Sequence, residues 1–172
     1  VDSWDSYLGF DPSMVYAELT TIFGGKDYSN VNSRYLELAT AEPVYVLSYA
    51  MLKFMLAEGA VRGWITSSAS THYTDGIKAS MKFTAGYTPD NVLFHHNRKM
   101  TDAYIDSYVA SDKVKLKTTA GEQVQLEQII TQRYLSTFML HAPFDAFFEN
   151  RRTGFPVFPV NPKSNFNLTA DK

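Results

Sequence analysis

The stretch LSYAMLKFMLAEGAVRGWI, Leu47 to Ile65, decides the fold class of this chain. Its apolar residues recur at steps of three and four, which is the spacing of one face of a helix. They are Leu47, Ala50, Met51, Phe54, Met55 and Val61. Pro43 suits the first turn of a helix and Gly63 suits its end. The pattern predicts a helix of about five turns between these two residues.

A second helix is expected directly after the first, from about Ser70 to Phe83, with Gly86 ending it. Gly76 lies inside this helix, where a glycine costs roughly 1 kcal/mol relative to alanine. The close approach of another backbone would explain that cost. The first helix offers small residues for such an approach, namely Ala57, Gly59 and Ala60. The two helices are therefore predicted to form a tight antiparallel hairpin, similar to one tetratricopeptide unit.

Two more helices are expected further along the chain. The first spans Asp102 to Ala110, because Thr101 can accept a backbone hydrogen bond as its N-cap. The second spans Glu122 to Met139, where four-residue steps carry an apolar stripe. The stripe consists of Leu126, Ile130, Tyr134 and Phe138. Pro143 is expected to open a last short helix, which Gly154 and Pro156 close.

The fold class predicted from these elements is mainly α, with tetratricopeptide-like helical hairpins and long loops, because no strand-rich region appears. Residues 87–99 are interpreted as a loop and residues 114–119 as a short extended segment. A chain of 172 residues suits one domain. We expect a single domain over 1–172, loop-rich over 1–42, a helical hairpin over 43–86, and helices with loops over 87–172.

Composition and charge exclude several classes of protein. The net charge of -2 gives no attraction to nucleic acid, so no such partner is expected. The absence of cysteine excludes disulfides, thiolate nucleophiles and a lipidated cysteine within this stretch. No apolar run approaches the roughly 18 to 20 residues that a membrane span needs. Adjacent histidines such as His95 and His96, beside Asp90, rarely bind one ion together. We therefore expect neither a metal nor a cofactor.

Aromatic residues make up 15% of the chain, and tyrosine and tryptophan rings can stack on sugars. Platforms for a ligand are expected in loops, where recognition residues concentrate. The candidates there are Trp4, Tyr7, Tyr28, Tyr87 and Phe94. Trp64 could also stack on a sugar, but its position just after a helix end favours packing against the fold.

A glycosidase using Asp145 and Glu149 is the rival hypothesis to a binding protein. Both carboxylates are expected on one short helix, one turn apart. That spacing puts them on the same side, with no opposing wall between which a sugar could lie. A helical scaffold that binds only protein is a further alternative, which the tetratricopeptide-like hairpin allows.

Three blocks of sequence resemble the C-terminal part of SusD/RagB outer-membrane nutrient-binding lipoproteins of Bacteroidetes. The first is Leu47 to Ile65, with its Ala57-Glu58 pair and Arg62-Gly63-Trp64 ending. The second is YTDGIKASM, Tyr73 to Met81, and the third runs from Ile130 to the NRRTGFP segment at Asn150 to Pro156. The resemblance covers roughly residues 30–165. A departure is Met51, where relatives often carry an acidic residue.

The resemblance implies a non-enzymatic, lipid-anchored protein on the outer surface of the outer membrane. Such a protein captures oligosaccharide and covers a SusC-like TonB-dependent transporter for polysaccharide uptake. Its lipid-bearing cysteine and most of its helices would lie upstream, so the chain resembles an internal fragment. The signature residues are expected to be structural, with Arg152 reaching Glu149 and Arg151 pairing with a buried carboxylate or a carbonyl. They are Glu58, Trp64, Arg151, Arg152, Thr153, Gly154 and Pro156.

Overall fold

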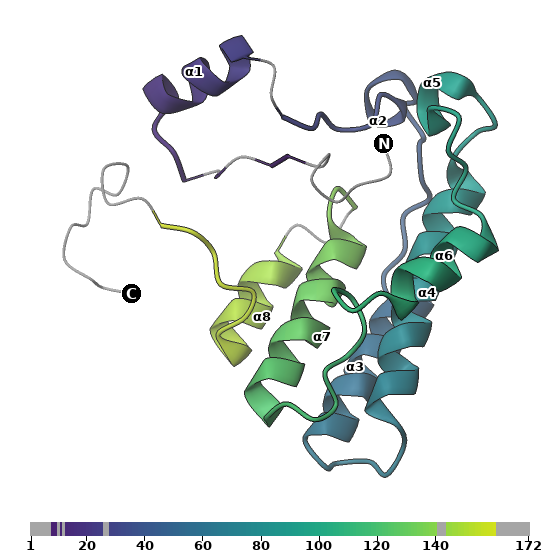
Figure 1. Ribbon diagram of the computed structural model, residues 1–172, viewed down its shortest axis with the longest axis vertical. Helices are drawn as coiled ribbons and strands as arrows, with labels where there is room; N and C mark the ends of the chain where they lie inside the picture. Colours follow the sequence, from purple (N-terminus) through teal and green to yellow (C-terminus); the bar gives the residue numbers. More distant parts are fainter. Residues whose placement is uncertain (1–7, 10, 12, 26–27, 141–143, 161–172) are drawn as a thin grey trace. The chain divides into compact units, whose positions relative to one another are not determined.

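The computed structural model describes residues 8–9, 11, 13–25, 28–140 and 144–160. Over these residues the chain forms eight α-helices and no strand, which confirms the prediction of a mainly α fold (Figure 1). The chain divides into two compact units, one formed by 1–32 with 157–172 and the other by 33–156. They are described separately below. No helix in the described ranges is long and apolar enough to span a bilayer.

The first unit contains helix α1, Tyr16–Gly25, within the segment predicted to be loop-rich. The Phe23 ring meets the Tyr28 ring edge-on, with centroids 5.2 Å apart. The backbone N–H of Ser29 donates to the Leu8 carbonyl at 2.7 Å, which closes this part of the chain on itself. The loop-rich prediction for 1–42 is therefore only partly right.

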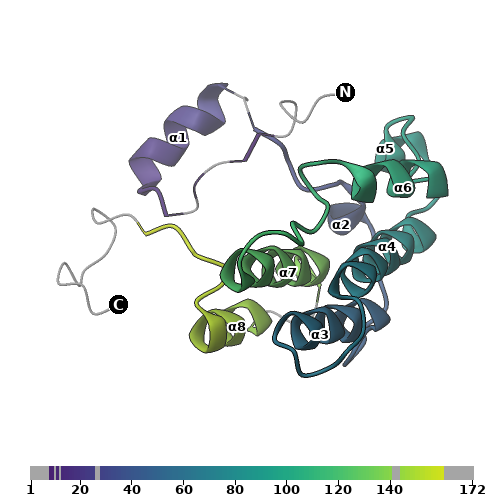
Figure 2. The same cartoon turned by 60° about the horizontal axis from the view of Figure 1, so that its bottom comes forward.

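The second unit is built on the hairpin of α3, Tyr49–Val61, and α4, Ala69–Tyr87, which run antiparallel and side by side in both views (Figures 1 and 2). The predicted start of α3 at Pro43 is wrong. Ser48 is the N-cap, and its side chain accepts a hydrogen bond from the Met51 N–H at 3.1 Å. A serine cap satisfies a free N–H that a proline further upstream cannot reach.

The predicted end of α3 at Gly63 is confirmed by a complete Schellman motif. Gly63 has a φ of +73°, a conformation that glycine adopts without strain. The Trp64 N–H donates to the Gly59 carbonyl at 2.8 Å, and the Gly63 N–H donates to the Ala60 carbonyl at 3.1 Å. These bonds satisfy carbonyls that would otherwise lack partners at the helix end.

Gly76 allows the two helices of the hairpin to approach closely, as predicted, but the partner is different. A Cβ at this position would lie 2.9 Å from the Phe54 ring, which is buried between α3 and α4. The expected partners were the small residues Ala57, Gly59 and Ala60. The prediction failed because the aromatic ring, rather than small-residue contact, fills the space between the helices.

Helix α4 is longer than predicted, since it continues through Gly86 to Tyr87. The segment predicted as a loop, 87–99, contains a short helix α5, Val92–His95. The Asn91 side chain caps α5 by accepting from the Leu93 N–H at 2.9 Å. A helix of this length carries too few residues for a periodic signal. Helix α2, Arg34–Glu37, escaped prediction for the same reason.

Helix α6, Asp102–Ala110, has the predicted bounds, and its Thr101 cap accepts from the Tyr104 N–H at 3.2 Å. The segment after it forms turns instead of the predicted extended segment. The Tyr73 hydroxyl of α4 holds this segment by donating to the Val114 carbonyl at 2.7 Å. Burial raises the pKa of Tyr73, so the hydroxyl remains a donor.

Helix α7, Glu122–Thr137, ends two residues before the predicted boundary at Met139. It adds apolar residues to the buried part of the unit around the hairpin. They are Leu126, Ile129 and Ile130. Helix α8, Asp145–Thr153, is the predicted last short helix; Pro143, expected to open it, lies outside the described residues.

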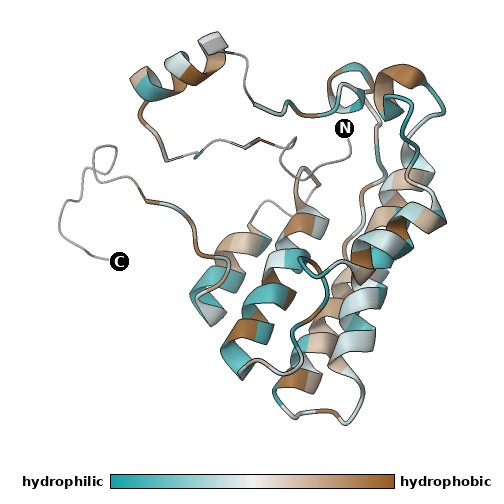
Figure 3. Cartoon of the chain, viewed as in Figure 1, coloured by the Kyte–Doolittle hydropathy of each residue, from teal (hydrophilic) through white to brown (hydrophobic). Residues whose placement is uncertain are grey.

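Helix α8 has no buried residue, although apolar side chains lie along it (Figure 3). Phe147 and Phe148 are both exposed, and Phe144 just before the helix is exposed as well. These three rings therefore face solvent within this chain. The helix is attached to its neighbours by charged side chains instead.

Candidate functional site

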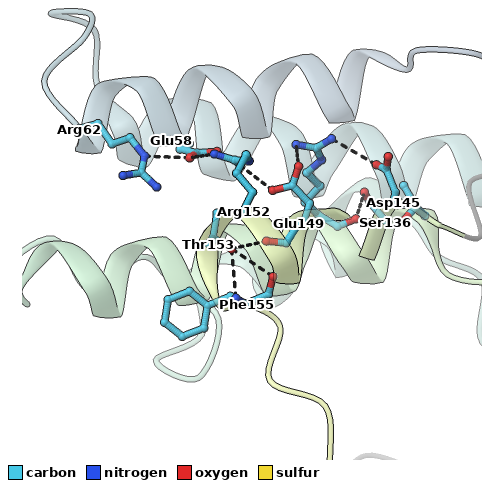
Figure 4. Close-up of polar contacts among 10 residues, drawn as sticks. Glu58, Arg62, Ser136, Asp145, Glu149, Arg152, Thr153 and Phe155 are labelled. Atoms are coloured by element: carbon cyan, nitrogen blue, oxygen red, sulfur yellow. Dashed lines mark hydrogen bonds and ion pairs between the residues drawn. The ribbon is translucent and has the colours of Figure 1, made fainter. Parts of the chain in front are cut away.

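Glu58 is the centre of a clamp between α8 and α3. Glu58 is buried, with 4% of the residue exposed. Arg152 donates to both carboxylate oxygens, through Nη1 and Nη2 at 2.6 Å each, in a bidentate pair (Figure 4). Arg62, at the C-cap of α3, adds a bond from Nε to Oε1 at 2.8 Å. The clamp joins residues 94 positions apart.

The charged contacts around Glu58 control its ionisation. Burial alone would raise the pKa of Glu58, because a carboxylate loses its hydration there. The hydrogen bonds and positive charges of Arg152 and Arg62 outweigh that effect and hold the pKa below its usual value. The carboxylates of Glu58 and Glu149 in turn raise the pKa of Arg152. The pair therefore stays ionised.

A second set of ion pairs joins α8 to α7. Arg133 of α7 binds Asp145 through Nη2 at 3.2 Å and Glu149 through Nη1 at 2.8 Å. Arg152 also binds Glu149, at 2.5 Å, which confirms the contact predicted from their spacing (Figure 4). Asp145 and Glu149 thus lie on one side of α8 and share one guanidinium. Both are bound by arginine on the same side, whereas the two carboxylates of a glycosidase flank the scissile bond.

Among the described residues, Arg151 is paired with no buried carboxylate, which was one of the two kinds of partner expected for it. Its guanidinium lies over the ring of Phe147, with Cζ 5.8 Å from the ring centroid. The residue that reaches the buried carboxylate is its neighbour Arg152. One residue along a helix changes the direction of a side chain by about 100°, so the two arginines meet different surroundings.

The end of the NRRTGFP segment forms a compact turn. Gly154 caps α8 in the left-handed conformation with a φ of +83°, which confirms its predicted role. Thr153 donates from its hydroxyl to the Glu149 carbonyl at 2.7 Å and accepts from the Phe155 N–H at 3.1 Å (Figure 4). The Asn150 amide donates to the Pro156 carbonyl at 2.8 Å. These bonds join residues of α8 to one another and to the turn that follows it.

The aromatic residues predicted as sugar platforms differ in how far the structure exposes them. Trp4 and Tyr7 lie outside the described residues. Tyr28 belongs to the first unit, where its ring meets that of Phe23. Tyr87, at the end of α4, is 48% exposed, whereas Phe94 of α5 is buried and offers little of its ring to a ligand.

Trp64 is more exposed than the sequence indicated. A packing role was favoured, yet 70% of the residue is accessible. Its backbone completes the Schellman motif, while its ring remains outside the core with the Arg62 guanidinium 5.4 Å from the ring centroid. Trp64 lies three residues beyond the last residue of α3, Val61, and its backbone is fixed by the cap. No local pattern in the sequence reports the exposure of its ring.

One small cavity lies between α3, α4 and α7, with a volume of about 80 Å³. Its walls combine apolar side chains with hydroxyls. They are formed by Tyr45, Ser48, Tyr49, Ala50, Ala79, Ser80, Phe83 and Ser136. Ligand pockets usually enclose roughly 300–1,000 Å³, so this cavity is too small for an oligosaccharide.

His95 and Asp90 form a pair, with Nε2 3.2 Å from Oδ1, and Lys99 binds the other oxygen of Asp90 at 2.6 Å. The Lys99 ammonium lowers the pKa of Asp90. Within the described part of the chain, no group of three or more His, Asp or Glu side chains could hold a metal ion.

The chain is similar to known proteins in sequence and in fold. Residues 7–170 match a SusD-like family described as starch-binding and associating with the outer membrane. The chain belongs to this SusD-like family. It is similar to the crystal structure of a SusD homologue from Bacteroides fragilis NCTC 9343, with 41% sequence identity and a TM-score of 0.88. That match covers 99% of this chain and 36% of the other.

Two further solved structures show the same likeness to the SusD-like chain. A second SusD homologue of B. fragilis NCTC 9343 has 32% identity and a TM-score of 0.78, over 95% of this chain and 34% of that one. An outer-membrane nutrient-binding candidate of Bacteroides vulgatus ATCC 8482 has 29% identity and a TM-score of 0.81. That match covers 94% of this chain and 34% of the other. The chain therefore spans about a third of the length of these relatives. Among curated proteins, none matches it.

Proposed function

We propose that the SusD-like chain contributes to a protein that binds oligosaccharide at the cell surface and delivers it to a SusC-like TonB-dependent transporter. The observation that carries this proposal is the match of residues 7–170 to a family described as starch-binding and associating with the outer membrane. The B. vulgatus relative, an outer-membrane nutrient-binding candidate, supports the same class of function.

The charged groups of the site support binding without turnover. Asp145 and Glu149 are both occupied by Arg133, and Glu58 is occupied by Arg152 and Arg62. A general acid and a general base must each reach the glycosidic bond from opposite sides. Carboxylates bound to arginine on one face of a helix do not meet that need. No cofactor enters the proposed function.

Attachment to the outer membrane is proposed to occur through a lipid on an N-terminal cysteine of the longer protein. The resemblance to surface lipoproteins and the family description support this location. The chain contains no cysteine that could carry the lipid. Fractionation of cells that express the protein, followed by protease treatment of intact cells, would test surface exposure.

Calorimetric titration against a panel of oligosaccharides tests the function. The panel is composed of malto-, cello-, xylo- and manno-hexaose. Binding of at least one glycan, with no shorter product detected by chromatography after prolonged incubation, is the expected result. Release of shorter sugars would refute the non-enzymatic proposal. Co-purification with an outer-membrane transporter from the native host would test the delivery step.

A protein-binding scaffold is a second candidate, and one specific observation favours it. Phe144, Phe147 and Phe148 expose their rings together at α8. Exposed aromatic groups are common in protein interfaces. If the protein binds no glycan in the panel but still co-purifies with a transporter, the scaffold function is preferred.

A further inference from the structure

The end of the α3–α4 hairpin presents an aromatic ring on a rigid support. The backbone of Trp64 is fixed by its hydrogen bond to Gly59, and Gly63 sets the direction of the chain just before it. The ring is 70% exposed. Exposing a large apolar ring to water is unfavourable, so an exposed ring on a fixed backbone is suited to contact with a ligand.

A guanidinium lies over this ring, and its own position is set by two carboxylates. The Arg62 guanidinium lies 5.4 Å from the ring centroid. It is oriented by Glu58 at 2.8 Å and by Glu122 of α7, whose Oε1 lies 3.6 Å from Nη1. The Glu122 side chain is 52% exposed, so its carboxylate can also accept hydrogen bonds from outside. The guanidinium therefore lies over the ring in a defined arrangement, with the Glu122 carboxylate bound to it.

Together these groups have the chemistry that a pyranose requires. A pyranose with equatorial hydroxyls has an apolar C–H face that can lie on an indole ring, and a rim of hydroxyls that donate and accept hydrogen bonds. The Trp64 ring supplies the apolar surface, Arg62 over it supplies donors, and the Glu122 carboxylate bound to Arg62 supplies an acceptor. The surface is open, which suits one sugar residue within a longer chain.

We infer that Trp64, with Arg62 over its ring and Glu122 bound to Arg62, forms a contact site for one pyranose residue of a glycan. This inference rests on the proposed function, because it assigns residues to the glycan binding suggested above. The site shares Arg62 with the Glu58–Arg152 clamp, whose carboxylate is already occupied within the fold. It also differs from the small cavity, which excludes a sugar chain by size.

The test uses the full chain and the glycan from the panel that binds it most tightly. Replacing Trp64 by alanine should raise the Kd about tenfold, which corresponds to roughly 1.4 kcal/mol. Glu122→Gln, which keeps the shape but removes the charge, should raise the Kd by a smaller factor. Tyr104→Ala is the matched control, because this ring is also exposed on a helix but lacks the flanking arginine. It should leave the Kd unchanged.

A spectroscopic measurement reports on the ring itself. The chain has two tryptophans, so labelling with 5-fluorotryptophan gives two fluorine signals, and Trp64→Phe identifies that of Trp64. Titration with the same hexaose should shift this signal at the calorimetric Kd. Unchanged affinity of Trp64→Ala, or a Trp64 signal that does not move, would overturn the inference while leaving the proposed function intact. Failure of the wild-type protein to bind any glycan would refute both.

Discussion

Removal of Arg152 should destabilise the fold more than removal of any other exposed arginine on α8. In Arg152→Met, the buried Glu58 carboxylate keeps only the bond from Arg62. Loss of one partner of a buried ion pair costs about 3–5 kcal/mol. The Arg152 side chain is 44% exposed, so water already screens part of the interaction. We therefore expect a loss of about 2–3 kcal/mol in the free energy of unfolding.

A double-mutant cycle separates the contact from its surroundings. Glu58→Gln keeps the size of the side chain and removes its charge, and the double variant removes both charges. Because the two arginine nitrogens each bind one carboxylate oxygen, the coupling energy should be about 1–2 kcal/mol. Urea unfolding at pH 7, followed by far-ultraviolet circular dichroism, measures each free energy. Arg151→Met is the matched control, with an expected change within about 0.5 kcal/mol.

Two results would refute this account of the clamp. One is a coupling energy below about 0.5 kcal/mol, which is the level of unrelated sites. The other is a control variant, Arg151→Met, as unstable as Arg152→Met, because only the latter arginine contacts the buried carboxylate.

Acid should weaken the same clamp. The folded pKa of Glu58 is lower than its value of about 4.3 in an unfolded chain, so ionised Glu58 contributes stability above that value. This contribution is lost as the pH falls through the lower folded pKa. The free energies of unfolding of wild type and Glu58→Gln should therefore converge as the pH is lowered from 5. A constant difference over that range would contradict the assignment.

Three other predictions concern residues of α4. Gly76→Ala should destabilise the protein by about 1–2 kcal/mol, because overpacking against Phe54 exceeds the gain in helix propensity. In the same helix Gly86→Ala should stabilise it by up to about 1 kcal/mol, since nothing lies within 4 Å of the new Cβ; thermal unfolding compares the two. Tyr73→Phe should cost about 1–2 kcal/mol in urea unfolding, because the buried Val114 carbonyl loses its donor, and an unchanged midpoint would contradict that bond.

The sequence predicted best those features that depend on local chemistry. Thr101 was identified as a cap because a hydroxyl at a helix start has a clear partner, and Gly63 and Gly154 as helix ends because glycine adopts positive φ. The start of α3 was placed too early, since Pro43 suits a first turn but does not require one. Periodicity alone did not show that Ser48 supplies the cap.

Features that depend on distant parts of the chain could not be predicted from the sequence. The spacing rule for helices found the contact of Arg152 with Glu149, but it says nothing of Glu58, which lies 94 residues away. Gly76 predicted a close approach to α4, but the sequence did not show that the Phe54 ring makes it. The exposure of Trp64 depends on how the hairpin packs, and no local pattern reports that.

Attachment by charge rather than by burial gives α8 a distinctive sensitivity to ionic strength. Salt screens charges over about 10 Å at 0.1 M and about 3 Å at 1 M, whereas it strengthens or leaves intact the contacts of an apolar core. The amides of α8 should therefore exchange with deuterium faster at high salt, while those of the α3–α4 hairpin remain protected. We therefore expect the last helix to detach and return more readily than the core against which it lies unfolds.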